Sequence, residues 1–237
     1  MKKNLKRGLS VLLLIALIFT VSIEAFAADR IQPGNKNIVQ LAVLYNSDNQ
    51  FFTTGTAVKV GTHQLLTAAH CLQKTCDTYY SDVYYKIYQQ KAADKFIKCT
   101  VVKMDTDLDM ALLEEDEVTP DRLKIAVNYI PSDTLPLYTV GYTPLKNVNL
   151  SQNLIFNCLV PIQYSLTDHY YYNKSAFVFT GKIYGGFSGT AALTQNNEIV
   201  SILNSDAYVS LNGVTTNYAF GVSNEQLNTF ITPDDLK

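Results

Sequence analysis

Residues 65–71 read LLTAAHC, where the apolar end of a strand runs into two alanines, a histidine and a cysteine. His70 is one of only three histidines in the chain, with His63 and His169. A lone histidine after a strand is usually a structural residue. His70 therefore indicates a catalytic role only if the chain also has an acid and a nucleophile that could act together with an imidazole. Two other segments have such residues.

The first of these segments is residues 106–114, TDLDMALLE. Asp109 stands at the opening of an apolar strand, and burying an unpaired carboxylate costs several kcal/mol. We therefore expect Asp109 to have a polar partner. Asp105 and Asp107 are close enough in the sequence to be the alternatives for the same role.

The second segment is residues 184–191, YGGFSGTA, with Ser188 among glycines. An imidazole can take the proton of a serine hydroxyl during nucleophilic attack, and a buried carboxylate orients that imidazole. Glycines before the serine let the main chain aim amide groups at a developing oxyanion. The sequence therefore predicts the catalytic residues His70, Asp109 and Ser188, and an oxyanion hole made by the amides of Gly186 and Ser188.

The rest of the chain predicts an all-β protein. Short segments rich in Val, Ile, Tyr, Phe and Thr recur between turn residues, which is typical of sandwiches and barrels. Residues 114–124, EEDEVTPDRLK, are charged and predict a connector between two β domains. The predicted strands are residues 38–45, 54–60, 83–88, 96–104, 137–141, 154–162, 176–179, 199–203 and 215–222.

The chain ends in a predicted short helix. Ser223 and Gln226 fit a capping box, and Leu227, Phe230 and Ile231 then fall on one helical face.

The N-terminus predicts export. A basic head, an apolar run and the small residues 25–27 form a signal peptide, residues 1–27, cleaved near Ala27. The alternative is an uncleaved anchor helix, for which the apolar run is short. Cleavage predicts a secreted or periplasmic protein that does not span a membrane, because no second apolar run of that length follows.

The charge of the mature chain argues against a nucleic-acid partner. The chain has 19 basic and 21 acidic residues, of which four basic and one acidic lie in residues 1–27, leaving 15 and 20, a net charge of −5. Nucleic acid and anionic membrane surfaces both favour a basic patch.

Four cysteines lie in the mature part: Cys71, Cys76, Cys99 and Cys158. An exported chain meets oxidising conditions, so two disulfide bonds with any of three connectivities are possible. A zinc site that uses Cys71 and Cys76 beside His70 is the weaker alternative, since the chain has no C-x-x-C pair.

Three motifs together resemble one family. TAAHC around His70, D-x-A-L-L from Asp109 and G-x-S-G around Ser188 are similar to the signatures of the chymotrypsin/trypsin-like serine peptidases, in the same order and with gaps of 39 and 79 residues. The resemblance covers essentially all of the mature chain. It implies two six-stranded antiparallel β-barrels, residues 28–120 and 121–222, with the active site between them, followed by a helix and tail, residues 223–237.

The same resemblance implies an activity. The expected function is that of a secreted serine endopeptidase, which cleaves a protein or peptide substrate through an acyl-enzyme intermediate. The resemblance implies no metal or organic cofactor, and we expect a monomer. Lys182, Ser201, Leu203 and Gly221 correspond to substrate-binding positions of the family, and the residue preference stays open.

Two departures from the family pattern matter. Animal digestive members carry an aspartate before the nucleophile, which receives the new N-terminus after zymogen cleavage, whereas this chain has Phe187. The chain is therefore more similar to bacterial trypsin-like and glutamyl-endopeptidase-like members, and processing at Arg30-Ile31 would have no such role. The family's partner of Cys71 lies near the segment TTGTAV, which has no cysteine, so pairing of Cys71 with Cys76 or Cys99 stays open.

Two alternative functions follow. An α/β-hydrolase esterase needs G-x-S-x-G and the order serine, acid, histidine, which is the reverse of the order here. A catalytically silent trypsin-like fold that serves as a secreted binding or adhesion protein is the alternative from another class. Such proteins usually lack a triad residue, and all three are present in this sequence.

Overall fold

The structure is a computed structural model that describes residues 30–44, 51–75, 78–80, 82–86, 97–116, 118, 122–143, 148–166 and 169–236. The chain divides into two compact units, Met1–Ile31 and Gln32–Lys237. The second unit holds the whole β fold. The predicted signal peptide and Cys76 lie outside the described residues.

The first barrel is closed by six strands in the order β1-β2-β3-β8-β7-β6, all paired antiparallel. Its core is built from aliphatic side chains, together with the thiols of Cys71 and Cys99. The strands are β1 (Ile38–Leu44), β2 (Phe51–Lys59), β3 (Gln64–Thr67), β6 (Asp82–Lys86), β7 (Ile97–Asp105) and β8 (Met110–Glu115), with β4 (Gln73–Thr75) and β5 (Thr78–Tyr79) in a separate two-stranded sheet.

The second barrel is closed in the order β10-β11-β14-β13-β12-β9, again antiparallel throughout. Its core is rich in aromatic side chains, and Phe177 meets Phe156 and Phe179 edge-on. The strands are β9 (Leu137–Thr143), β10 (Val148–Leu166), β11 (His169–Thr180), β12 (Ala191–Leu193), β13 (Ile199–Leu211) and β14 (Val214–Val222).

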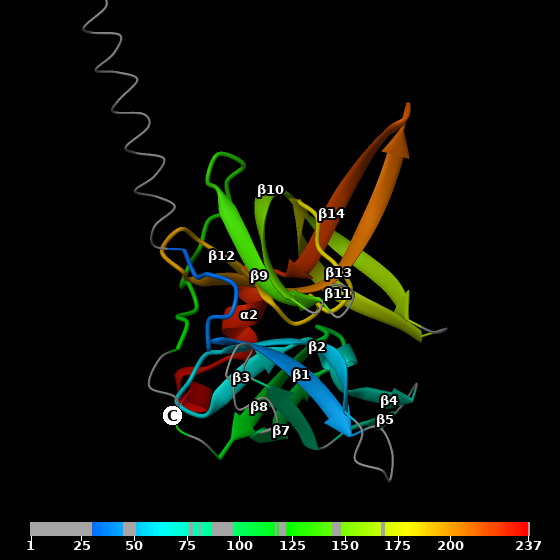
Figure 1. The fold of residues 1–237 in the computed structure, drawn as a ribbon. Coiled ribbons are helices and arrows are strands. Elements are labelled where there is room, and N and C mark those ends of the chain that lie inside the picture. Colours follow the sequence, from blue (N-terminus) through cyan, green and yellow to red (C-terminus); the bar gives the residue numbers. More distant parts are fainter. Residues whose placement is uncertain are drawn as a thin grey trace, which may run out of the picture. The chain divides into compact units, whose positions relative to one another are not determined.

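A single short helix, α2 (Asn224–Phe230), follows the second barrel (Figure 1). The predicted capping box is present, since Ser223 accepts from the Gln226 amide and the Gln226 side chain accepts from the Ser223 amide. Leu227 and Phe230 are buried, as the helical pattern predicts. A 3-10 turn, η2 (Pro233–Leu236), ends the described chain. Within the described residues, no helix has the length and hydropathy that crossing a membrane requires.

The two six-stranded antiparallel barrels and the short terminal helix confirm the predicted fold. The predicted connector, residues 114–124, is wrong at its start, because Glu114 and Glu115 belong to β8. Glu115 is buried and its carboxylate lies 2.9 Å from the Lys59 ammonium. A buried charge can lie inside a strand when it is paired with an opposite charge. The charged residues of the sequence predicted a connector because the sequence does not show this pairing.

The pair β13 and β14 extends well beyond the barrel. β13 continues past Leu203, the end predicted from the sequence, to Leu211. The turn that follows has Asn212 and Gly213 at φ of 50° and 78°, the backbone that a two-residue hairpin with right-handed strand twist requires. Figure 1 shows this two-stranded ribbon projecting away from the other strands.

Candidate active site

The topology of the first barrel brings His70 and Asp109 together. β3 ends at Thr67, and His70 lies in the 3-10 turn η1 (Ala69–Leu72) that follows. β3 pairs with β8, with Thr67 opposite Ala111. Asp109 immediately precedes β8, so the end of β3 and the start of β8 place these two residues side by side, although 39 positions separate them.

The carboxylate of Asp109 contacts His70 twice. Oδ2 lies 2.7 Å from the ring Nδ1, and Oδ1 accepts a 2.8 Å hydrogen bond from the His70 amide. The Asp109 carbonyl also accepts from the Ala69 amide at 3.1 Å. Asp109 is 1% exposed, so the polar partner predicted for this acid is His70. The two alternatives to Asp109 that the sequence offered lie in other surroundings. The Asp105 carboxylate accepts from the Leu108 amide, and Asp107 is exposed.

The pairing changes the acidity of His70. Burial alone would lower its pKa, but the electrostatic effects of Cys71 and Asp109 and the hydrogen bond to Asp109 outweigh burial and raise the pKa well above its ordinary value. Asp109 acts on the ring through both its charge and its 2.7 Å contact with Nδ1. An imidazolium at this position is therefore stabilised, which is the state that a general base reaches after it takes a proton.

Asp109 adopts a backbone conformation that few side chains take. Its φ of 55° lies in the left-handed region, where Asp and Asn are tolerated better than most residues. The turn before it is closed by a hydrogen bond from the Asp109 amide to the Thr106 carbonyl at 3.3 Å. A strained residue kept by a network of hydrogen bonds is common at functional sites.

Ser188 lies in the loop between β11 and β12, and Phe187 anchors that loop in the second barrel. Phe187 is fully buried in the core cluster, and its ring lies 5.9 Å from that of Tyr184. Its amide donates to the Tyr184 carbonyl, and its carbonyl accepts from the Thr190 amide, both at 2.9 Å. A Cβ added to Gly141 would lie 2.7 Å from the Phe187 ring, so strand β9 packs directly against the anchor.

The first barrel holds the same loop through Thr56 of β2. The Thr56 amide donates to the Ser188 carbonyl at 2.9 Å, and its hydroxyl donates to the Gly186 carbonyl at 2.7 Å. The same hydroxyl accepts from the Tyr142 amide at 3.1 Å. Thr56 is fully buried. Sequence reasoning missed this residue, because a threonine in a β-rich segment gives no signal of its own.

These contacts leave two amides of the loop without protein partners. Within the described chain, neither the Gly186 amide nor the Ser188 amide donates to another group. Gly186 has a φ of 96°, which favours glycine, and a Cβ on Gly189 would lie 2.2 Å from the Thr56 carbonyl oxygen. The loop therefore offers the pair of backbone donors that an oxyanion hole needs.

The backbone carbonyl of Ser188 lies close to η1, the turn that carries His70. That carbonyl lies 3.5 Å from the thiol of Cys71, the residue after His70. Among the residues described, no hydrogen bond joins the Ser188 hydroxyl to the His70 ring. Catalytic hydrogen bonds are often long without substrate and tighten when it binds.

The predicted substrate-binding residues divide into two kinds. Lys182 is exposed, with its ammonium 5.0 Å above the Tyr184 ring. Ser201 and Leu203 are fully buried, and Leu203 exchanges backbone hydrogen bonds with Gly189 and Thr190. Gly221 pairs with Leu203, and a Cβ there would lie 2.3 Å from the Ser201 hydroxyl. Ser201, Leu203 and Gly221 thus hold the strands beside the Ser188 loop in place.

The described cysteines are free thiols. Cys71 and Cys99 are buried and Cys158 is exposed. The Cys71–Cys99 pairing left open by the sequence is therefore absent from the structure. The residue of β2 that faces the Cys71 thiol is Gly55, and a Cβ added there would lie 2.4 Å from the Cys71 sulfur. Among the described residues, no group of three His, Cys, Asp or Glu side chains could hold a metal.

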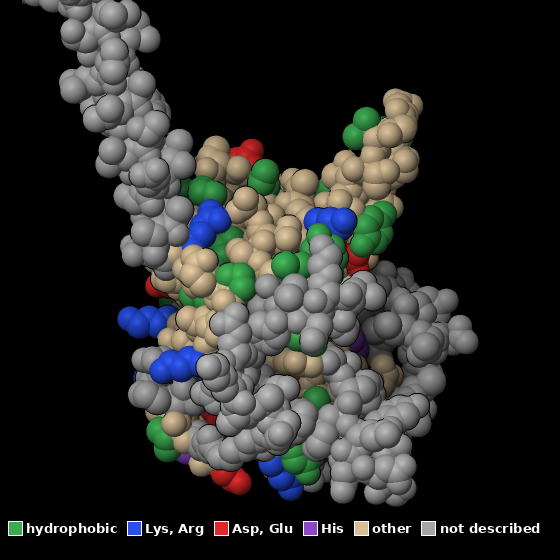
Figure 2. Space-filling model, in the orientation of Figure 1, with side chains coloured by type: hydrophobic (Ala, Val, Ile, Leu, Met, Phe, Trp, Pro, Cys, Tyr) green, Lys and Arg blue, Asp and Glu red, His purple; other side chains and the backbone are tan. Residues whose placement is uncertain are grey.

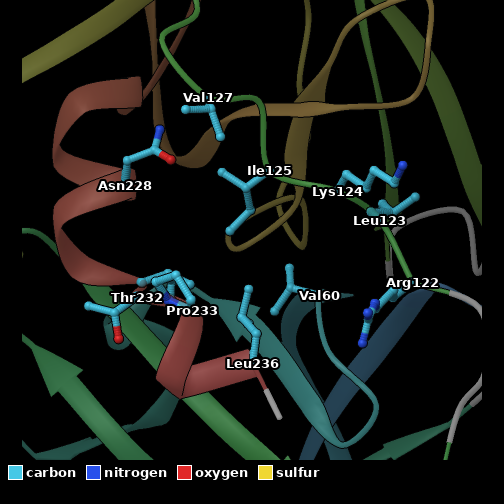
Figure 3. Close-up of a pocket in the computed structure, with 11 residues that line it drawn as sticks. Val60, Arg122, Leu123, Lys124, Ile125, Val127, Asn228, Thr232, Pro233 and Leu236 are labelled. Carbon is cyan, nitrogen blue, oxygen red and sulfur yellow. The ribbon is translucent and has the colours of Figure 1, made fainter.

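Two cavities lie away from these residues. The larger, of about 650 Å³, is formed by the segment 122–127, Val60 and the end of the chain around Leu236, as Figure 3 shows. Its lining is mainly aliphatic, with Arg122 and Lys124 on one side. The other, of about 440 Å³, lies between Tyr129, Phe156 and the start of α2. Neither is lined by His70, Asp109 or Ser188.

Solved structures with this fold include bacterial proteases. The active form of the protease Rv3671c from M. tuberculosis is 15% identical, with a TM-score of 0.63, covering 83% of this chain and 80% of that chain. Its inactive form is 16% identical, with a TM-score of 0.58 and coverage of 83% and 88%. The serine endoprotease from Yersinia pestis is 14% identical, with a TM-score of 0.58 and coverage of 82% and 61%. At this identity the likeness concerns the fold.

Comparison of the sequence with family models assigns the chain to a family. No curated protein sequence matches the chain. A family model described as a trypsin-like peptidase domain matches residues 53–202, which include His70, Asp109 and Ser188. The matched residues are more than half of the chain, and the chain therefore belongs to the trypsin-like peptidase domain family.

Proposed function

We propose that this protein is a secreted serine endopeptidase that uses Ser188 as nucleophile, His70 as general base and Asp109 as the residue that orients the base. The observation that carries the proposal is the double contact of the Asp109 carboxylate with the ring and amide of His70. The two unpartnered amides of the Ser188 loop support it further.

The proposed reaction is acyl transfer. Ser188 attacks the scissile carbonyl and gives its proton to His70, whose second ring nitrogen remains bonded to Asp109. The amides of Gly186 and Ser188 then stabilise the oxyanion, each contributing about 3–4 kcal/mol to the transition state. His70 next protonates the leaving amine, which departs. Water then attacks the acyl-enzyme by the same route and restores Ser188.

The cellular setting follows from the sequence. The predicted signal peptide supports a secreted or periplasmic location. The family supports a protein or peptide substrate, and we propose that the enzyme acts as a monomer. We expect no nucleic-acid partner and no attachment to a membrane after cleavage. The N-terminal sequence of the exported protein tests this: a chain that starts near Ala28 supports the proposal, and a retained residue 1 contradicts it.

The activity is tested by covalent labelling with a fluorophosphonate, a probe that reacts with activated serine hydroxyls. The wild-type protein should be labelled in a time-dependent way, and Ser188→Ala should abolish labelling while the circular dichroism spectrum stays unchanged. His63→Ala is the matched control, because the His63 ring contacts the Glu115 carbonyl instead of the site. This variant should be labelled like the wild type.

A folded wild-type protein that takes up no label would contradict the proposal and favour the binding or adhesion role. Labelling that survives Ser188→Ala would assign the nucleophile to another residue. Either result can be read directly from the labelled band and its mass.

A further inference from the structure

We infer that the larger cavity, between the segment 122–127 and the end of the chain, binds an aliphatic chain that ends in a carboxylate. The inference goes beyond the proposed function, because His70, Asp109 and Ser188 do not line this cavity. Its volume of about 650 Å³ is in the range of sites that hold small organic ligands. The ligand class follows from the apolar walls and from two cations at one side.

The apolar walls come from three separate parts of the chain. Val60 follows β2, Leu123 and Ile125 belong to the segment that connects the barrels, and Ile231 and Leu236 follow α2. Val60, Leu123 and Ile231 are buried, so their side chains are held in place by the fold. These walls favour an aliphatic ligand, because each CH₂ group that leaves water against them lowers the free energy of binding.

Two cations, Arg122 and Lys124, lie beside these walls (Figure 3). They are two positions apart and both are exposed, as expected for residues on the same side of an extended segment. Within the described chain, neither side chain forms an ion pair or a hydrogen bond. A ligand carboxylate here would therefore form charge-assisted hydrogen bonds that no protein group already makes, and a guanidinium can bind both of its oxygens.

The acceptors and donors around the cavity are otherwise engaged. The described residues that line it include no Asp or Glu. Asp235, in the adjacent turn η2, bonds to Lys103 and to the Thr232 hydroxyl. The Asn228 amide nitrogen donates to the Ala126 carbonyl at 3.0 Å. Among the side-chain donors that line the cavity, the two cations are thus those left for a ligand.

Paired cations are a local feature of this protein. The chain has more acidic than basic residues, with a net charge of −2, so the molecule as a whole does not attract anions. On the face that Figure 2 shows, the coloured Lys and Arg side chains are few and scattered among hydrophobic and uncharged surface. Attraction of an anion therefore depends on where cations lie together, and Arg122 and Lys124 do so beside an apolar cavity.

The cavity lies where the connecting segment joins the two barrels. The Leu123 amide donates to the Lys59 carbonyl of the first barrel at 2.9 Å, and the Ile199 amide of the second barrel donates to the Lys124 carbonyl at 2.8 Å. A ligand in the cavity contacts Val60 and the connecting segment together. Since the unfolded chain has no such site, the melting temperature should rise with the concentration of the ligand.

Two kinds of molecule carry this chemistry. A fatty acid has one aliphatic chain and one carboxylate. A short peptide that ends in leucine has an aliphatic side chain beside its terminal carboxylate. The experiment therefore uses one probe of each kind, octanoate and acetyl-leucyl-valyl-leucine, and pairs each with its neutral counterpart, octan-1-ol and the peptide amide.

Binding is measured by calorimetry on the protein that carries Ser188→Ala, so that no reaction takes place at the proposed nucleophile. At least one carboxylate should bind about tenfold more tightly than its neutral counterpart, because the neutral group forms no charge-assisted hydrogen bond with the cations. The carboxylate with the larger preference identifies the source of the ligand. The same carboxylate should raise the melting temperature in proportion to its affinity.

A double variant isolates the two cations. Arg122→Gln with Lys124→Gln should lower the affinity for the carboxylate about tenfold and leave the affinity for the neutral counterpart unchanged. Lys74→Gln is the matched control, because this exposed lysine of β4 lies outside the lining of the cavity. The control should keep the full preference for the carboxylate.

Three outcomes overturn the inference. One is equal affinity, or no binding, for each carboxylate and its neutral counterpart. Another is a preference for the carboxylate that survives the double variant. The third is competition in the wild type, in which the bound carboxylate blocks fluorophosphonate labelling and so lies at Ser188. Absence of labelling without any ligand would contradict the proposed function alone, since binding is measured in Ser188→Ala.

Discussion

At the scale of single residues, the site depends on how Asp109 is surrounded. Its carboxylate is buried and bonded to both the ring and the amide of His70. A carboxylate held in this way fixes the tautomer of the imidazole and stabilises its protonated form. The raised pKa of His70 is the measurable sign of that stabilisation.

The pH dependence of the free enzyme should therefore report His70. Only the neutral ring accepts the Ser188 proton, so kcat/KM should fall as the pH drops through the pKa of His70, with a midpoint above the ordinary value of about 6.5. Asp109→Asn should move this midpoint downward and reduce kcat by roughly 10⁴-fold. A wild-type midpoint at or below the ordinary value would contradict the raised pKa.

The same shift predicts a stability effect with a definite sign. A folded-state pKa above the unfolded value means that the folded protein holds the proton more tightly. This contribution is fully present below a pH of about 6.5 and is lost as the pH rises through the folded pKa. Denaturant titrations at several pH values, compared between wild type and Asp109→Asn, would show the loss in the wild type alone.

The candidate triad was accessible to sequence reasoning because its residues are chemically unusual in their segments. A buried-looking aspartate, a rare histidine and a serine among glycines each stand out. Thr56 does not stand out, because threonine is ordinary in a strand and its role depends on two contacts with a loop 130 positions away. Such contacts follow only from the three-dimensional arrangement.

At the scale of elements, the loop that carries Ser188 is held from both barrels. Phe187 fixes it in the second barrel, and the Thr56 hydroxyl of β2 fixes the Gly186 carbonyl. Because this carbonyl is held by Thr56, the Gly186 amide on the other side of the same Cα is restrained as well. Thr56 is thus a positioning residue for the proposed oxyanion hole.

Thr56→Val should lower kcat with little change in KM. The isosteric side chain keeps the packing but loses the hydroxyl's hydrogen bonds to the Gly186 carbonyl and the Tyr142 amide. An oxyanion hole acts in the transition state, not in the bound substrate. We expect a loss of about tenfold, less than the 10²–10³-fold that removal of a donor costs. Thr56→Ser keeps the hydroxyl and should recover most of the rate. An equal loss in both variants would indicate packing instead of the hydrogen bond.

Sequence reasoning located most strands but not their lengths. Alternating and β-branched residues identified both barrels, whereas β13 was predicted to end at Leu203 because the polar residues 204–206 follow it. The strand continues because its partner β14 supplies the pairing that the side-chain pattern does not predict. Asn212-Gly213 is the signal that would have revealed the hairpin.

At the scale of the whole molecule, the question is whether the site needs a newly formed N-terminus. In the zymogen mechanism of the digestive relatives, an aspartate beside the nucleophile binds that terminus. Here Phe187 occupies the position and is fully buried among apolar side chains, including those around Leu137 and Val200. An apolar anchor forms when the second barrel folds, without an ion pair to complete it.

Proteolytic trimming of the N-terminus should therefore leave the activity unchanged. Chains that begin at Ala28 and at Gln32 should show the same kcat and the same rate of fluorophosphonate labelling, because the loop is already held by Phe187 and Thr56. Phe187→Leu should keep labelling, whereas Phe187→Asp should lose it, since the buried carboxylate would cost several kcal/mol without a partner. A large rate increase on trimming to Gln32 would show that the terminus completes the site after all.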